Sequence, residues 1–278
     1  IEPFTQDSGL PLSLKNFISY YHLDPGSIYG KFSFSRLCAA AGVLDDFAEP
    51  AESILTKAFS KLVSVDSRRW IKFLTDILPR FSCELAASLS DFEKRMLQMF
   101  YITVFQEAAD WRSHTTQANM QLLADSPIMM HELNELLSFN LERIDFIDQP
   151  VPLGFDCPLD LHCTYTRDQI LIAMDYMTPK NVREGVKWLP DKQVDVFFIT
   201  LNKADKDYSP TTMYNDYSIN ESLFHWQSQS TTSDTASTGQ RYINHRQRGS
   251  KVVLFVREFK QDSIGAAPYT CLGTAAYV

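Results

Sequence analysis

The sequence predicts an α+β protein, in which a helical N-terminal region precedes a mostly antiparallel β-barrel or curled sheet. Helical periodicity and capping signals dominate residues 1–150, whereas runs rich in Val, Ile, Phe, Tyr and Thr dominate residues 194–278. Between these regions, Asp148–Pro152 holds two prolines, which interrupt regular structure. We therefore predict a helical connector over residues 1–150 and a second domain over residues 151–278.

The predicted helices of the first region start at capping residues. Ser90–Glu93 has the form of a capping box, and the apolar residues behind it keep helical spacing to about Trp111. Ser126 followed by Pro127 fits an N-cap with proline at the first helical position, ahead of a helix that reaches Ile144. Helical spacing also predicts helices over residues 14–21, 33–41 and 52–64.

The second region begins with one helix and continues with strands. Thr166–Gln169 resembles a capping box and predicts the helix. Strands are predicted over residues 194–202, 211–219, 222–230, 251–259 and 269–278. Their lengths and spacing suit a small barrel or curled sheet. Residues 230–239 consist of Ser, Thr, Asp, Ala and Gly, and this composition predicts a mobile loop.

Charge is distributed unevenly along the chain. The 278 residues have a formal net charge of -8, and most of the acidic excess lies in residues 1–150. One basic cluster follows the low-complexity run and consists of Arg241, Arg246, Arg248, Lys251, Arg257 and Lys260. The overall charge is not that of a nucleic-acid-binding protein. Any contact with phosphates would therefore have to come from this local cluster.

The cysteines and the chain start indicate a compartment. Five scattered cysteines are typical of a reduced, cytoplasmic protein. Cys157, His162 and Cys163 are near one another, but no second pair follows at zinc-site spacing, so we expect no metal. No apolar run is long enough for a transmembrane helix, and we expect no membrane partner. The chain starts without Met or a signal region, which predicts a fragment of a longer polypeptide.

Motifs of common enzymes are missing from the sequence. There is no phosphate-binding loop and no G-x-S-x-G elbow. His131-Glu132 begins like a zinc-protease helix, but Glu135 stands where the second histidine would be. We therefore expect a binding module rather than an enzyme. An alternative is a nucleotide-processing enzyme with His225 as general base, although no nucleophile or paired carboxylate accompanies it in the sequence.

The predicted strand over residues 222–230 allows two interpretations. Alternation places His225, Gln227 and Gln229 on one face, and Phe224 and Trp226 on the other. In the first interpretation the aromatic rings fill a core and the polar face meets solvent. In the second, the strand contacts nucleic acid, because amides and an imidazole carry donors and acceptors suited to base edges.

Neighbouring residues favour a pocket for a flipped base. Such a base is stacked between aromatic or apolar groups and is read along its hydrogen-bonding edge. The candidate pocket residues are Trp226, Tyr214, Asp216, His225, Gln227, Gln229, Tyr217 and Tyr208. Trp226 or Tyr214 would stack, Asp216 would accept from the cytosine edge, and the polar face of the strand would read edges or fill the gap in the duplex.

The candidate phosphate ligands come from the basic cluster, and each candidate role has an alternative. These ligands are Arg241, Arg246, Arg248 and Lys251. The basic residues can equally form a solvated hairpin tip. Asp216 can instead cap a turn.

Four stretches of the second region resemble one family. They are REGVKWLP (183–190), FFITLNKADKDYSPTTMYNDYSINESLFHWQSQSTT (197–232), TGQRYINHRQRGSKVVLFVREFK (238–260) and APYTCLGTAAYV (267–278). The second region is similar to the C-terminal domain, long of unknown function, of SauUSI-type restriction enzymes. These modification-dependent (type IV) enzymes join a phospholipase D-like nuclease to a superfamily 2 helicase. The resemblance is dense over residues 160–278 and fainter over 10–150.

The resemblance implies a role in bacterial phage defence. It implies a reader of 5-methylcytosine-type bases in double-stranded DNA, by base flipping on a PUA/SRA-like barrel. ATP and Mg would serve the motor and nuclease domains of the parent chain, in the bacterial cytoplasm, and this fragment would be non-catalytic and without a cofactor. The alternative is a structural coupling module that docks on the helicase or nuclease without recognising a base.

Overall fold

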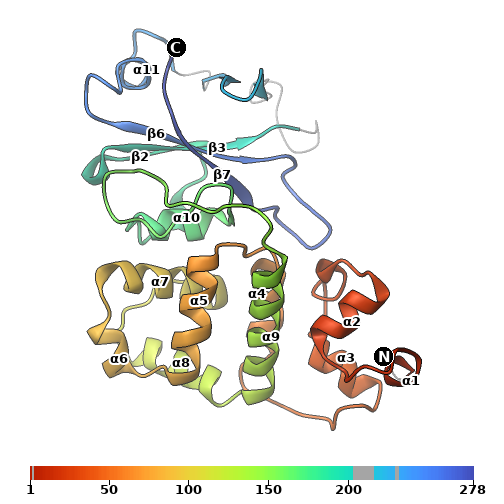
Figure 1. The fold of residues 1–278 in the computed structure, drawn as a ribbon. Coiled ribbons are helices and arrows are strands. Elements are labelled where there is room, and N and C mark those ends of the chain that lie inside the picture. Colours follow the sequence, from red (N-terminus) through yellow and green to blue (C-terminus); the bar gives the residue numbers. More distant parts are fainter. Residues whose placement is uncertain (2, 203–215, 229–231) are drawn as a thin grey trace.

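The computed structural model describes residues 1, 3–202, 216–228 and 232–278. Helices form the lower part of the molecule in Figure 1, and a sheet with its flanking segments forms the upper part. This arrangement confirms the predicted α+β class. The chain passes between the two parts after α9, near the predicted boundary at Asp148–Pro152, and the division into two domains stays a prediction.

The lower part is a layer of packed helices. Its members are α1 (Phe4–Ser8), α2 (Leu14–Tyr21), α3 (Phe34–Ala40), α4 (Glu52–Leu62), α5 (Arg68–Ile77), α6 (Cys83–Ser88), α7 (Asp91–Phe105), α8 (His114–Ala124) and α9 (Pro127–Arg143). Every helix predicted in this region is present, whereas α1, α5, α6 and α8 were not predicted. Among the described residues, no helix is both long and apolar enough to cross a membrane.

The helix starts predicted at Ser90, Ser126 and Thr166 are all present, and Ser126 differs from the other two in its hydrogen bonds. The boxes at Ser90 and Thr166 both form, and α7 ends at Phe105, with its C-cap Gln106 in the left-handed region, rather than near Trp111. Ser126 is the N-cap residue of α9 with Pro127 at the first helical position, as predicted, but its side chain accepts no hydrogen bond from the start of the helix. Instead the Glu49 carboxylate, from a distant segment, accepts from the backbone N–H groups of Ile128 and Met129 at 2.8 and 2.9 Å.

The upper part is built on a five-stranded mixed sheet. Its strands are β1 (Thr164–Tyr165), β2 (Val186–Leu189), β3 (Val194–Thr200), β6 (Lys251–Arg257) and β7 (Tyr269–Ala275), in the order β1-β7-β6-β3-β2. The β3–β6 pair is parallel and the other pairs are antiparallel. Of the two predicted alternatives, the described strands form the curled sheet and not a closed barrel.

A local irregularity bends the sheet. The register between β6 and β7 shifts at Leu254/Phe255. Gly273 lies opposite Leu254 with a φ of 87°, and a Cβ atom there would lie 2.5 Å from the Leu161 side chain. Glycine therefore allows both the backbone conformation and the close approach of Leu161.

The connection between β3 and β6 differs from the prediction. Of the strand expected over residues 222–230, the described part 222–228 forms only β5 (Phe224–His225), which pairs with β4 (Tyr217–Ser218) in a separate two-stranded sheet. The loop expected over residues 230–239 gives way to α11 (Ser237–Ile243). The prediction for 230–239 is wrong from Ser237 onward, because Gly239 is buried in a tight helix contact rather than exposed in a loop.

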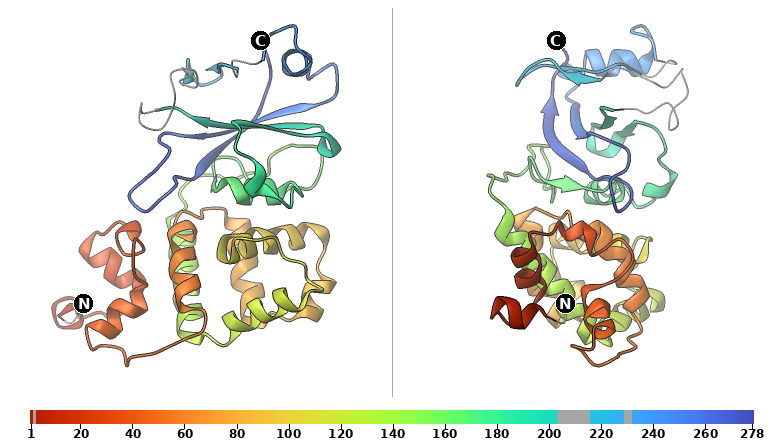
Figure 2. Two further views of the ribbon diagram at one scale, coloured as in Figure 1. Left: turned by 180° about the vertical axis from the view of Figure 1, so that it is seen from behind. Right: turned by 90° about the vertical axis from the view of Figure 1, so that its right-hand side faces the viewer.

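The sheet separates two environments. Its lower face packs on α10 (Arg167–Ala173) and on the helical layer, and one continuous core runs from α4 and α7 to β3 and β6. Its upper face carries a smaller cluster around Phe197, Ile199, Val252 and Val256. The two views of Figure 2 show α11 and the β4–β5 hairpin on this upper side, away from the helical layer.

Candidate functional site

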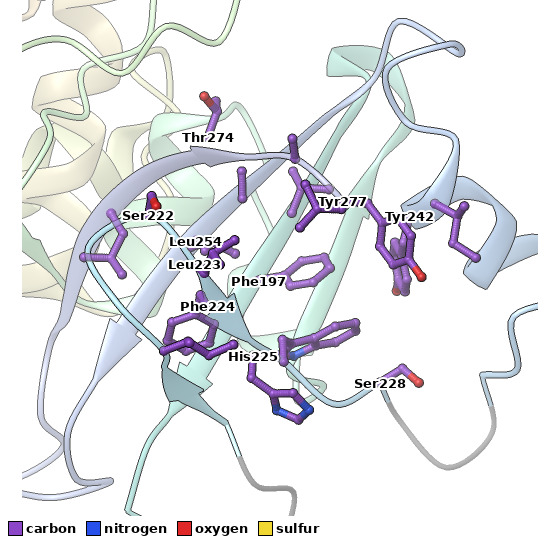
Figure 3. A pocket seen from close by; sticks show the side chains of 18 of the residues that line it. Phe197, Ser222, Leu223, Phe224, His225, Ser228, Tyr242, Leu254, Thr274 and Tyr277 are labelled. Carbon is purple, nitrogen blue, oxygen red and sulfur yellow. The ribbon is translucent and has the colours of Figure 1, made fainter.

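A pocket of about 900 Å³ lies on the upper face of the sheet. Phe197, Val252 and Leu254 contribute its floor from β3 and β6. The β4–β5 hairpin forms one side, α11 and the residues after it form another, and the end of the chain from Leu272 forms a third (Figure 3). The volume lies in the range of sites that bind small molecules or exposed parts of larger ones.

Three aromatic rings meet at one side of this pocket. The ring centroids of Phe197 and Trp226 are 4.4 Å apart, and that of Tyr242 lies 5.2 Å from Phe197 and 5.6 Å from Trp226. The rings come from β3, from the residue after β5 and from α11. Trp226 is half-buried against the upper core, so it serves in packing and also lines the pocket. We call Phe197, Trp226 and Tyr242 the aromatic cluster.

The strand alternation expected around Trp226 is present. Phe224 and Trp226 are half-buried, while His225 and Gln227 are exposed. The His225 ring stacks on the Tyr217 ring of the paired strand, with centroids 4.7 Å apart and planes 15° apart. His225 also contributes to the pocket lining, and in Figure 3 its ring lies at the edge of the labelled side chains.

Asp216 has a structural contact of its own. Its side chain is buried and accepts the backbone N–H of Gln227 at 2.9 Å, which ties the start of β4 to the end of β5. Asp216 is not part of the pocket lining. Its role as a base acceptor stays a prediction, and the observed contact is closer to the alternative of a turn-stabilising residue. Tyr208, Tyr214 and Gln229 lie outside the described residues.

The four predicted phosphate ligands fall into two groups. Arg246 and Arg248 are exposed, and Arg246 lines the pocket. Arg241 instead donates from two nitrogens to the buried Asp195 carboxylate, and Lys251 donates from Nζ to the Pro152 carbonyl oxygen at 2.7 Å. Their contacts make Arg241 and Lys251 structural in this conformation, whereas Arg246 and Arg248 are directed to solvent.

Sequence reasoning missed Phe197, Tyr242 and Asp195. Phe197 was read only as part of a strand, and Tyr242 only as a neighbour of basic residues. Asp195 gave a signal, because it is a charged residue inside the otherwise apolar run 194–199. A carboxylate in such a strand requires a partner, and Arg241 is the partner.

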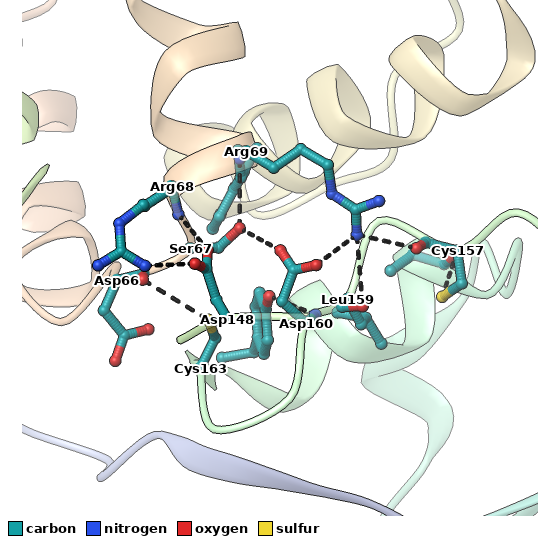
Figure 4. Close-up of polar contacts among 12 residues, drawn as sticks. Asp66, Ser67, Arg68, Arg69, Asp148, Cys157, Leu159, Asp160 and Cys163 are labelled. Atoms are coloured by element: carbon teal, nitrogen blue, oxygen red, sulfur yellow. Dashed lines mark hydrogen bonds and ion pairs between the residues drawn. The ribbon is translucent and has the colours of Figure 1, made fainter. Parts of the chain in front are cut away.

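A second polar cluster lies beneath the sheet, where the chain enters the upper part (Figure 4). The Arg68 backbone N–H and guanidinium both bind Asp148, and Arg69 Nη2 lies 2.6 Å from Asp160. Ser67 Oγ donates to Asp160 at 2.7 Å. We call these five residues the junction cluster. It connects the start of α5 to the segment before β1.

Asp148, Asp160 and Cys163 also lie close enough together to be considered as metal ligands. The two carboxylates are already paired with arginines, and the Cys163 thiol donates to the Asp66 carbonyl oxygen at 3.5 Å. Burial raises the pKa of Cys163, which disfavours the thiolate that a metal requires. We therefore interpret this group as an ion-pair network.

Asp66 precedes the junction cluster and is a carboxyl group with a raised pKa. Burial raises its pKa from 3.8 to about 6, against the hydrogen bond that its carboxylate accepts from the Thr164 backbone N–H at 2.7 Å.

Burial also raises the pKa of Cys157 to about 12. The Cys157 thiol donates to the Ala173 carbonyl oxygen. Among the described residues, Cys157, His162 and Cys163 do not come together as a group of possible metal ligands.

Comparison with known proteins adds one finding about the sheet-bearing part. No curated protein matches the chain. One protein-family model, however, matches a segment that includes every strand of the sheet, α10, α11 and the whole pocket lining. Residues 159–278 match the family described as "Domain of unknown function (DUF3427)".

Proposed function

We propose that residues 159–278 form a reader of double-stranded DNA that takes a modified cytosine, turned out of the duplex, into the pocket on the upper face. The observation that carries this proposal is the pocket lining, in which the aromatic cluster lies beside the exposed Arg246. A flipped base needs ring faces for stacking, and the flanking backbone needs a cation. A 5-methyl group would add apolar contact with the same lining.

The charge distribution supports an approach of DNA from the upper side. Arg246 and Arg248 are exposed next to the pocket, whereas the acidic excess belongs to the helical part on the opposite side of the sheet. A duplex would be attracted to the first surface and repelled by the second. The polar side chains of the hairpin, among them Ser218 and Asn220, would supply hydrogen bonds to the base.

The proposal places this chain within a larger, ATP-dependent and modification-dependent restriction enzyme of the bacterial cytoplasm. In that enzyme the described part would be non-catalytic and would hold no cofactor. ATP and Mg would serve motor and nuclease domains in other parts of the parent protein. The sequence resemblance over residues 160–278 motivates this placement.

Binding to matched duplexes tests the proposal. The chain is titrated against duplexes that differ only in one cytosine, which is unmodified, 5-methylated or 5-hydroxymethylated, in several sequence contexts at one stated salt concentration. We expect tighter binding to a modified duplex, and we expect Trp226→Ala to reduce that preference because a stacking ring is lost. Equal affinities in all contexts would contradict the proposal.

A pair of arginine variants separates phosphate contacts from general charge effects. Arg246→Ala should weaken binding to every duplex and lower the salt slope by about one. Arg112→Ala removes another exposed arginine, from the helical part, and should leave binding and salt slope unchanged. Equal effects of both variants would show that only net charge matters.

A second candidate function is structural coupling to a motor or nuclease domain. The junction cluster favours it, because ion pairs between the helical layer and the sheet-bearing part would transmit a displacement of either one. A gel-shift at low salt distinguishes the candidates. Failure to retard any DNA would favour coupling and would exclude the reader.

A further inference from the structure

Asp195 is a fully buried carboxylate on β3, which lies between β2 and β6 in the sheet. Burial raises its pKa, and the Arg241 guanidinium acts in the opposite direction. Two nitrogens of Arg241 donate to its two oxygens at 2.8 and 2.9 Å. A buried pair of this kind adds little net stability compared with apolar residues, but it fixes the relative position of the segments that carry it. The question is therefore which geometry the pair fixes.

The pair determines where α11 lies on the sheet. Arg241 belongs to α11, and its guanidinium stacks over Trp188 at 4.5 Å from the ring centroid. Trp188 is the cross-strand partner of Asp195, so both anchor points lie on one side of the sheet. The next residue, Tyr242, belongs to the aromatic cluster, and a shift of α11 would therefore change one side of the pocket.

The helix depends on such contacts for its position. It has seven residues and no side-chain N-cap, so local interactions alone stabilise it weakly. A Cβ atom on Gly239 would lie 2.0 Å from the Ser233 carbonyl oxygen, which shows how closely the helix fits against the preceding turn. A small displacement of α11 toward Ser233 would therefore be opposed by a steric clash. A displacement away from the sheet would be opposed by the ion pair of Arg241 and Asp195.

A neighbouring histidine connects the same region to a further side of the pocket. His245 is buried, its Nδ1 lies 3.2 Å from the Ser250 carbonyl oxygen, and its Nε2 accepts the Tyr277 backbone N–H at 3.3 Å. These contacts hold the imidazole between the residues after α11 and the end of the chain. Tyr277 lines the pocket. Two sides of the pocket are therefore oriented by polar contacts: α11 by the ion pair, and the end of the chain by His245.

We propose that Asp195 and Arg241 are positioning residues that determine the specificity of the pocket, an inference that rests on the proposed function. The pair holds Tyr242 against Trp226 and Phe197 in the arrangement that receives the base. Arg241 does not bind phosphate in this role. The phosphate contacts belong to Arg246 and Arg248.

Arg241→Lys tests this role, because lysine keeps the charge but loses the paired geometry and the stacking on Trp188. Arg183→Lys is the matched control, an exposed arginine of the same part of the chain that does not line the pocket. We expect Arg241→Lys to reduce the preference for modified over unmodified duplex about tenfold, with the salt slope unchanged. We expect the near-ultraviolet circular dichroism of the aromatic cluster to change without DNA, and the control to leave both measurements unaltered.

The double variant Asp195→Leu/Arg241→Met separates positioning from stability. Apolar residues of similar size replace the buried pair, so the thermal midpoint should stay the same or rise. The preference for modified duplex should still fall about tenfold, because α11 has lost its directional contact. A double variant with full preference would overturn the proposal, even if Arg241→Lys folded poorly.

The measurements distinguish failure of this inference from failure of the reader function. If the unaltered chain binds no DNA, the reader function fails, and the specificity role that rests on it is overturned too. If the chain discriminates but Arg241→Lys keeps both preference and spectrum, only the positioning role is overturned. A salt slope reduced by about one in Arg241→Ala, with an unchanged spectrum, would identify Arg241 as a phosphate ligand and would overturn the inference as well.

Discussion

The two faces of the sheet are covered in different ways. On the lower face, Val196 and Phe255 belong to a core that continues through α10 into the helical layer. On the upper face, Phe197 and Val252 belong to a small cluster, and a pocket remains beside it. The same strands supply both faces, because successive residues point to opposite sides.

The polar contacts of the two faces differ as well. Beneath the sheet, the junction cluster joins segments that are far apart in the sequence, such as Arg69 and Asp160. Above it, the pair of Asp195 and Arg241 anchors one short helix. The lower face is thus arranged for stability, and the upper face leaves apolar and aromatic surface available for a ligand.

Neighbouring residues of β6 give the largest test of this difference. Phe255 is fully buried on the lower face, whereas Leu254 is half-buried beside the pocket. Phe255→Ala should lower the free energy of unfolding by about 3–5 kcal/mol, and Leu254→Ala by roughly 1–2 kcal/mol, because its side chain already meets solvent. Urea denaturation measures both. Equal losses would mean that the upper face is packed as tightly as the lower one.

The junction cluster gives the next largest effect. Asp160→Ala would leave Arg69 and Ser67 without their carboxylate partner and should cost roughly 2–4 kcal/mol of unfolding free energy. Asp191→Ala removes an exposed carboxylate from the same part of the chain and should change stability by less than about 0.5 kcal/mol. Thermal and urea unfolding should agree on this ranking. A loss for Asp160→Ala no larger than the control would show that the junction contributes no stability.

The lower region was easier to predict from sequence than the upper one. Helices with strong periodicity and local caps, such as the helix after Ser90, were located correctly because their signals lie within a few residues. α5 was missed although its signals were present, since Ser67 caps it and Trp70 starts a buried stripe. The carboxylate that accepts from the first N–H groups of α9 could not be found locally, because Glu49 is distant in sequence.

The candidate site depended on contacts that no local pattern records. Alternation around Trp226 was predictable, and the structure has it. The meeting of Trp226 with Phe197 and Tyr242 depends on how the segment between β3 and β6 returns over the sheet. Arg241 was grouped with phosphate ligands by its basic neighbours, and only the fold places it against Asp195.

Asp66, beneath the sheet, should make the stability of the protein depend on pH. Its folded-state pKa of about 6 lies above its ordinary value of 3.8, so folding favours the protonated form. The stability from this group is present below about pH 4 and is lost as the pH rises through about 6. Asp66→Asn cannot ionise and keeps an oxygen for the Thr164 N–H. At pH 7 the variant should be more stable than the unaltered chain by roughly 1–2 kcal/mol, a value reduced for partial solvent exposure.

Comparing the unaltered chain with Asp66→Asn separates the pH dependence that comes from Asp66 from that of the other carboxyl groups. Unfolding free energies are measured at pH 4 and pH 7 for both, and the advantage of Asp66→Asn should grow between the two. A constant difference across this range would contradict the raised pKa. Because Asp66 lies beneath the sheet, this pH dependence should leave the aromatic signal of the pocket unchanged.

The smallest expected effect on stability concerns the apolar surface of the pocket. Leu272 lines it with 45% of its surface exposed, whereas the preceding residue, Cys271, is fully buried on the other face. Leu272→Ser should change the unfolding free energy by less than about 0.5 kcal/mol. It should nevertheless reduce the fluorescence of a bound apolar dye, since the dye requires accessible apolar surface. Leu10→Ser alters a similarly exposed leucine in the helical part and is the control. If both variants lowered dye fluorescence equally, the dye would be reporting scattered surface residues. A loss confined to Leu272→Ser would show that the upper face accepts an apolar ligand without contributing its surface to folding.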